Sequence, residues 1–201
     1  MTPPRDRLQR RLSGAVRDVT RRVDAPQLAA VAVVVAAAVA VFAVSTTVFA
    51  YHSSNHDEGV YLLQAALLLE GQLELRAGEL AGAFRPWFFI EDGGRLYPKY
   101  TPVPAALFAV SMALFGEPRV TLAAVAAANA GLTYLLGATV FDRRVGAVAA
   151  ALFAASPLAL VTTSAFLPYA PTTALNLLFA VAYLRGVRDG STAAAGVAGI
   201  A

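Results

Sequence analysis

The sequence predicts an all-α membrane protein in which several hydrophobic helices surround one large polar loop. Hydrophobic residues make up 58% of the 201 residues and charged residues only 14%, whereas a soluble domain carries about 25% charged residues. Several uncharged runs reach the length of about 20 residues that a helix needs to cross a bilayer. The chain has no cysteine, which excludes a disulfide framework, a thiolate zinc site and a cysteine nucleophile.

The first 26 residues are predicted to form a basic tail on the cytoplasmic side. Its arginines are Arg5, Arg7, Arg10, Arg11, Arg17, Arg21 and Arg22. Arginine-rich flanks of membrane helices stay in the cytoplasm and attract anionic lipid headgroups. No aromatic residue lies among these arginines, so we expect membrane lipid as a partner and no nucleic acid. The chain is accordingly expected to be a multi-pass protein of the cell membrane.

Residues 27–190 are expected to form the transmembrane region. Residues 27–50 carry no charge and exceed the roughly 7–15 apolar residues of a signal peptide, so they predict a retained membrane helix. Further apolar blocks lie at residues 102–116, 120–141, 145–167 and 170–184, and Pro157 interrupts the third of these. Residues 191–201 are small and apolar, and we expect them to begin a helix that the end of the chain truncates.

Basic residues between the blocks predict which blocks cross the membrane. The clusters at Arg143 and Arg185 both lie on the cytoplasmic side, as the positive-inside rule requires, only if residues 102–116 do not cross. We therefore expect this short block to form a re-entrant or interfacial helix. Residues 51–118 then form one large external loop, and residues 164–171 form a second, short external turn.

The large loop opens with two adjacent carboxylates, Asp57 and Glu58. They stand at the start of a predicted helix over residues 57–70, which Asn55 or Ser54 can cap. Burial at the membrane surface would raise a carboxylate pKa toward the range useful for a general base, and the same pair can bind a hard cation. Alternatively, the two carboxylates only stabilise the positive end of the helix. The apolar stripe of this helix is typical of a helix at the membrane interface.

Lys99 is the only lysine of the chain and stands before the short apolar block. A lone cation there either binds a phosphate as a point charge or snorkels to the lipid headgroups. Arg119 opens the next apolar block and is expected on the same side of the membrane. Aromatic residues such as Trp87 and Tyr100 are typical of interface anchors, and residues 92–94 mark a turn.

Two motifs, in this order and in this placement against the apolar blocks, carry a resemblance to a known family. The first is Asp57-Glu58-Gly59-Val60-Tyr61 after the first helix, and the second is Lys99-Tyr100-Thr101-Pro102 before the short block. Together they resemble the amino-terminal part of a GT-C type membrane glycosyltransferase, and most of all the branch of the protein O-mannosyltransferases and the lipid A aminoarabinose transferases. The resemblance covers about residues 28–188.

The resemblance implies a transferase that moves a sugar from a polyprenyl phosphate to an unidentified acceptor on the outer face of the membrane. It assigns Asp57 as the catalytic base or acceptor-orienting group, with Glu58 assisting. It assigns Lys99 as the contact of the lipid phosphate, whose developing negative charge a fixed cation stabilises. The other residues expected to bind substrate are Tyr61, Tyr100, Arg119 and His56. A divalent cation stays open as a cofactor, with Asp57 as its ligand, and these residues indicate no other cofactor.

Other functions stay open at this point. Many relatives carry an acidic residue in the second external turn, whereas residues 164–171 contain no carboxylate here. This difference and the truncated last helix favour a non-catalytic or truncated membrane protein that binds polyprenyl lipid or a partner. A transporter is disfavoured, because transporters place charged residues within their spans, and the charges of this chain gather in the loop.

Overall fold

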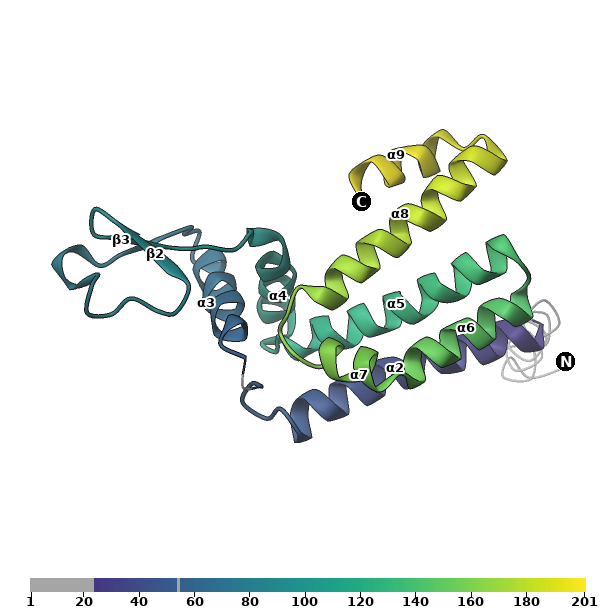
Figure 1. Ribbon diagram of the computed structural model, residues 1–201, viewed down its shortest axis with the longest axis horizontal. Helices are drawn as coiled ribbons and strands as arrows, with labels where there is room; N and C mark the ends of the chain where they lie inside the picture. Colours follow the sequence, from purple (N-terminus) through teal and green to yellow (C-terminus); the bar gives the residue numbers. More distant parts are fainter. Residues whose placement is uncertain (1–23, 54) are drawn as a thin grey trace, which may run out of the picture.

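The computed structural model describes residues 24–53 and 55–201, whose helices and strands are labelled in Figure 1. The predicted basic tail therefore lies outside the described residues except for residues 24–26, and so does Ser54 as a candidate helix cap. The described chain is mostly helical, as predicted, but it also contains a small three-stranded antiparallel sheet. The sheet corrects the prediction of an all-α chain. Its strands were not predicted because they are only two to four residues long and show no clear alternation of apolar and polar residues.

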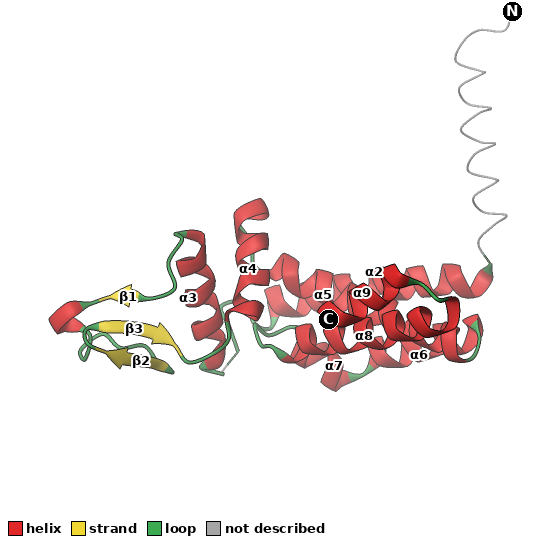
Figure 2. Cartoon of the chain, turned by 90° about the horizontal axis from the view of Figure 1, so that it is seen from above, coloured by secondary structure: helices red, strands yellow, loops and turns green. Residues whose placement is uncertain are grey.

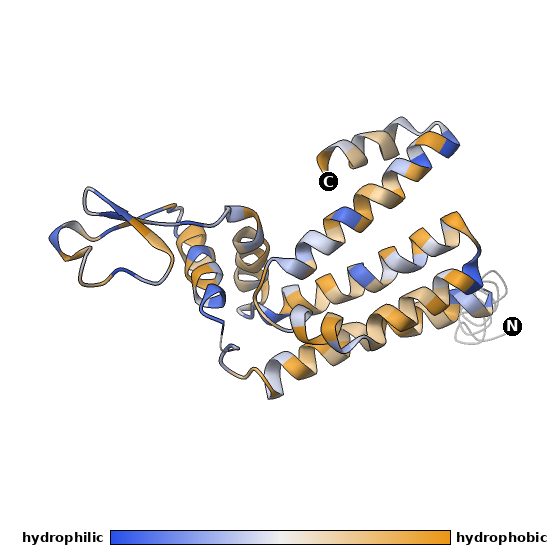
Figure 3. Cartoon of the chain, in the orientation of Figure 1, coloured by the Kyte–Doolittle hydropathy of each residue, from blue (hydrophilic) through white to orange (hydrophobic). Residues whose placement is uncertain are grey.

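The helical bundle is built from three long helices, α2 (Ala25–Thr47), α5 (Arg119–Val140) and α8 (Tyr169–Asp189), and three shorter ones. The shorter helices are α6 (Arg143–Ala155), α7 (Pro157–Thr163) and α9 (Thr192–Ile200). Helices α2, α5 and α6 pack against one another, α8 packs on α5, and α9 folds back on α8 (Figure 1). Hydrophobic residues predominate along α2, α5 and α6, and hydrophilic residues gather in the sheet and at several helix ends (Figure 3).

Two helices of the described chain, α2 and α5, are long and apolar enough to cross a membrane. Helices α6 and α7 are bent by 64° against each other and count together as one further candidate span. The bend follows from Pro157 and from Ser156, whose hydroxyl accepts a hydrogen bond from the backbone of α7. Helix α8 falls short in hydropathy, since it contains Asn176 and Arg185. The crossing of residues 170–184 therefore stays a prediction.

The predicted large loop folds as a separate layer at one end of the bundle. It contains α3 (Asp57–Leu69), β1 (Leu75–Arg76), the short 3-10 helix η1 (Gly78–Leu80), β2 (Phe89–Asp92), β3 (Arg95–Pro98) and α4 (Pro102–Phe115). Both α3 and α4 run across the bundle axis rather than along it, and the sheet extends beyond α3 (Figures 1 and 2). The predicted turn at residues 92–94 is confirmed, because Gly93 and Gly94 connect β2 to β3 with φ angles of 58° and 80°.

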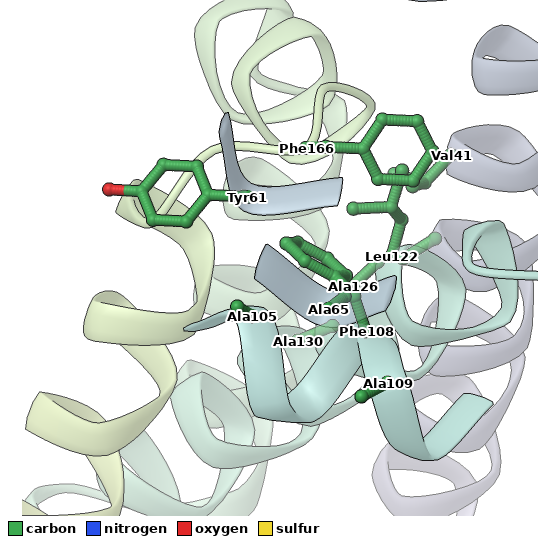
Figure 4. Packing of buried hydrophobic residues seen from close by; sticks show 11 residues of the cluster. Val41, Tyr61, Ala65, Ala105, Phe108, Ala109, Leu122, Ala126, Ala130 and Phe166 are labelled. Carbon is green, nitrogen blue, oxygen red and sulfur yellow. The ribbon is translucent and has the colours of Figure 1, made fainter. Parts of the chain in front are cut away.

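One hydrophobic core joins this layer to the bundle. Val41 of α2, Phe108 of α4 and Leu122 of α5 belong to it, together with several small alanines (Figure 4). Phe166, from the turn between α7 and α8, packs its ring edge-to-face against Phe108 at 5.5 Å between centroids. A second cluster, which includes Val60 and Leu96, packs the sheet against the opposite side of α3. Helix α3 is therefore held on both sides.

Basic residues mark the end of the bundle that lies opposite α3. Arg143, at the start of α6, pairs with Asp24 at 2.7 Å, and Asp24 also caps the start of α2. Arg188, in the last turn of α8, donates a hydrogen bond to the carbonyl oxygen of Thr139 near the end of α5. Three chain segments that are distant in the sequence therefore bring their charges to the same end.

Close packing of α5 against α6 depends on glycine. A Cβ atom on Gly146 would lie 2.5 Å from the carbonyl oxygen of Tyr134, and one on Gly137 would lie 2.8 Å from the Cα atom of Gly146. These obstacles are backbone atoms, so they cannot be relieved by a rotamer change. Small residues permit such close approach of membrane helices.

We expect Gly146→Ala to separate α5 from α6 and to destabilise the protein by about 1–3 kcal/mol, as overpacking does in closely packed interiors. The measurement is the thermal unfolding midpoint of the detergent-solubilised protein. Gly131→Ala on α5 is the matched control, because its Cβ would meet only a valine methyl group at an ordinary 3.6 Å. Equal midpoints for the two variants would contradict the close α5–α6 contact.

Candidate functional site

The first turn of α3 places the two predicted carboxylates in different environments. Asp57 is partly exposed, and its Oδ1 accepts a hydrogen bond of 2.8 Å from the hydroxyl of Tyr100. Glu58 is completely buried. Consecutive helical residues do not face the same side, so one carboxylate points toward the loop and the other toward the bundle. Asn55, a predicted cap, accepts a hydrogen bond of 3.0 Å from the backbone of Asp57 just before the helix.

Glu58 connects α3 to the turn between α7 and α8. One carboxylate oxygen accepts hydrogen bonds from the backbone N–H and the hydroxyl of Ser53. The other accepts a bond of 2.8 Å from the backbone N–H of Phe166. Residues 164–171, which contain no carboxylate, are thus bound to the carboxylate of Glu58, which lies 108 residues before Phe166 in the sequence. Both carboxylate oxygens of Glu58 therefore accept hydrogen bonds from within the protein.

Aromatic rings hold Tyr100 beside Asp57. Tyr61 stacks on Tyr100 with 5.2 Å between ring centroids, and Phe88 contacts it at 5.9 Å. The Tyr61 hydroxyl points away from the alanine-rich core (Figure 4). The ammonium group of Lys99 lies 4.3 Å from the centroid of the Phe88 ring and 5.1 Å from that of Tyr100. A cation and a carboxylate therefore contact the same tyrosine.

His56 stands at the edge of this group. Its imidazole stacks on the indole of Trp87, with 5.1 Å between centroids and an angle of 9° between the planes. Trp87 and Tyr100 were expected to anchor the loop at the membrane interface. The structure places both of them in the aromatic group around Asp57. The predicted site residues Asp57, His56, Tyr61, Lys99 and Tyr100 are thus brought together.

Arg119 lies in a different place. Its guanidinium donates hydrogen bonds to the carbonyl oxygens of Ser45, Phe49 and Ala50, at the end of α2, and it pairs with Glu117 at 3.2 Å. A cation at a helix C-terminus stabilises the negative end of the helix dipole. Its three guanidinium nitrogens are engaged within the protein, so the geometry favours a structural role for Arg119 over the predicted substrate contact.

No sequence pattern indicates the conformation of Phe88. Its φ angle of 57° lies in the left-handed region, which is rare for a bulky residue. The backbone N–H of Phe89 donates to the carbonyl oxygen of Pro86 at 3.2 Å, which closes a turn around Phe88. Strain of this kind costs about 1–3 kcal/mol and is commonly retained at functional sites. The turn sets the Phe88 ring between Lys99 and Tyr100.

The environment of Asp57 also changes the acidity of the neighbouring phenols. Burial and the hydrogen bond to the Asp57 carboxylate raise the pKa of Tyr100 to about 12. Burial and the charge of Asp57 raise the pKa of Tyr61 as well. Both phenols are therefore protonated at neutral pH, and Tyr100 acts as a hydrogen-bond donor to Asp57.

Metal binding would depend on ligands from outside this group. Within residues 24–53 and 55–201, no three histidine or carboxylate side chains are close enough to hold a metal ion together. Asp57 is the predicted ligand and the one carboxylate of this group that faces the loop. A hard cation bound to Asp57 would therefore need water or substrate oxygens to complete its coordination.

Comparison with protein-family models, with curated proteins and with solved structures finds no match for this chain. Its function therefore has to be argued from the residues and the geometry of the site.

We expect Asp57→Asn to lower the pKa of Tyr100 from about 12 part of the way toward the ordinary value of about 10, because burial remains while the negative charge is lost. Ultraviolet titration of the phenolate in the folded protein measures this change, and Tyr100→Phe identifies the signal. Because the pKa is raised on folding, the stability that Tyr100 contributes is complete below about pH 10 and is lost as the pH rises toward 12. An unchanged high-pH titration step in Tyr100→Phe would contradict the assignment.

Proposed function

We propose that the loop layer carries the active site of a GT-C type membrane glycosyltransferase, which transfers a sugar from a polyprenyl phosphate to an acceptor on the outer face of the membrane. One observation supports this proposal above all. The Asp57 carboxylate accepts a hydrogen bond from the Tyr100 hydroxyl and the Lys99 ammonium group lies over the Tyr100 ring, so a proton acceptor and a fixed cation contact the same side chain.

The reaction uses these two groups for different tasks. An acceptor hydroxyl attacks C1 of the sugar, while the bond between C1 and the phosphate oxygen breaks and its electron pair leaves with the phosphate. The proton of the attacking hydroxyl passes to Asp57, as in general base catalysis. Lys99 stabilises the negative charge that develops on the polyprenyl phosphate. The hydroxyl of Tyr100 donates a hydrogen bond to Asp57 and thereby orients the carboxylate.

Glu58 is better suited to positioning than to the assisting role implied by the resemblance. Its oxygens are buried and bind the backbone of Ser53 and Phe166. These contacts fix the first turn of α3, and with it Asp57, against the bundle.

The distribution of charge supports an external position for the loop. Arg143 and Arg188 lie at the end of the bundle opposite α3, where the positive-inside rule places the cytoplasm. Helices α3 and α4 run across the bundle axis, as interfacial helices do. The site then stands at the level of the outer headgroups, where the phosphate of a lipid donor is found.

A non-catalytic protein that binds polyprenyl lipid is the second candidate. An apolar groove of about 380 Å³ between α4 and α5 favours lipid binding, and its walls include Leu107, Val110, Phe115, Val120 and Val125. This groove suits an isoprenoid chain in either case, so it does not distinguish binding from catalysis.

We expect Asp57→Asn to lower the rate of sugar transfer by about 100-fold or more, while the variant still retains labelled polyprenyl phosphate. Transfer from a polyprenyl-phosphate sugar is measured with the protein in membrane vesicles. Asp92→Asn, in the exposed β2–β3 hairpin, is the matched control and keeps normal transfer. Normal transfer by Asp57→Asn would exclude the catalytic role, and lipid retention without transfer by the unaltered protein would support the second candidate.

A further inference from the structure

Trp87 is the only tryptophan of the chain and remains 69% exposed. One face of its indole stacks on His56, which directly precedes Asp57 in the sequence. The ring is therefore held beside the site while much of its surface remains accessible. The exposed part of the indole is available to a ligand.

A hollow adjoins this indole. It measures about 250 Å³ and is lined by Arg85, Pro86, Trp87, Phe88 and Phe89. Pockets for drug-sized ligands measure about 300–1,000 Å³, so this hollow is of a size for a single ring. The left-handed backbone of Phe88 shapes it, since that residue turns the chain between Trp87 and β2.

One basic residue lines the hollow, and a second lies near one of its aromatic walls. Arg85 contributes a guanidinium group, which can donate to hydroxyl or phosphate oxygens. The Phe88 ring contacts Trp87 edge-on at 6.1 Å between centroids, and the Lys99 ammonium group lies 4.3 Å from the centroid of that same ring. A phosphate bound to Lys99 would thus lie only one aromatic ring away from Trp87.

We propose that Trp87 is the stacking platform for the glycosyl ring of the phosphate-linked sugar, a subsite that rests on the proposed function. The C–H groups of a pyranose carry partial positive charge and are attracted to the negative face of an indole, as cations are. The sugar stacks on the indole face opposite His56, Arg85 donates to its hydroxyl groups, and its phosphate lies at Lys99.

The single tryptophan provides a direct test by fluorescence. The full-length protein in detergent is titrated with polyprenyl phosphate and, in parallel, with mannosyl and glucosyl polyprenyl phosphate. We expect a glycosylated lipid to change Trp87 emission beyond the change caused by the bare lipid. Retention of radiolabelled lipid, measured separately, reports binding that does not depend on tryptophan.

Substitution of the platform gives the second readout. We expect Trp87→Leu to weaken retention of the glycosylated lipid about three- to tenfold, the worth of one aromatic contact, and to leave retention of bare polyprenyl phosphate unchanged. Phe84→Leu is the matched control, because Phe84 is an equally exposed aromatic residue of the same loop that does not line the hollow.

The possible results separate the subsite from the function on which it rests. Retention of glycosylated lipid without a sugar-dependent change in Trp87 emission would overturn the subsite and leave the proposed function intact. Equal loss of bare and glycosylated lipid in Trp87→Leu would also overturn it, since Trp87 would then contact the lipid phosphate only. Failure of the unaltered protein to retain any of these lipids would contradict the proposed function itself.

Discussion

The carboxylate of Glu58 joins two segments that are far apart in the sequence, the start of α3 and the turn before α8. It is completely buried and accepts hydrogen bonds from the backbone of Ser53 and of Phe166. A buried carboxylate is stable only when such donors compensate for its lost hydration. Because Phe166 also packs against Phe108 of α4, the same contact fixes the loop layer on the bundle. Asp57 lies in the same first turn of α3, so this contact also fixes its position.

Helical geometry then determines what Asp57 can do. Adjacent side chains of a helix point about 100° apart. Because the Glu58 side chain points into the core, the side chain of Asp57 points toward the loop. There it meets the phenol of Tyr100, which is held between Tyr61 and Phe88. The site therefore contains one carboxylate that is available to a ligand. The two adjacent acids therefore differ in their surroundings: Glu58 is buried and bound to backbone N–H groups, and Asp57 is within reach of a ligand.

Hydropathy patterns were sufficient to predict a mostly helical chain with helices that can span a membrane, and the capping signals predicted the helix that starts at Asp57. The motif positions also predicted that Asp57, Lys99 and Tyr100 would be important, and the structure brings them together. The sheet, the left-handed turn at Phe88 and the contact of Glu58 with Phe166 were missed. Each depends on tertiary contacts between short or distant segments, for which local periodicity carries no information. The contacts of Arg119 with the carbonyl groups of Ser45 and Ala50 also span 74 and 69 residues of sequence, and its contact with substrate stays a prediction.

The charged residues of the candidate site lie outside the apolar helices of the bundle. Charged groups are costly within a bilayer, and Asp57, Glu58 and Lys99 all lie in the layer at the end of the bundle rather than among α2, α5 and α6. A lipid phosphate at the headgroup level would meet Lys99 there, while its apolar chain lay in the groove between α4 and α5. Lys99 stands only three residues before α4, so one short segment would contact both parts of such a lipid. The aromatic rings around Lys99 replace part of the water that an ammonium group loses, through cation–π attraction, and so hold the cation in place without neutralising it.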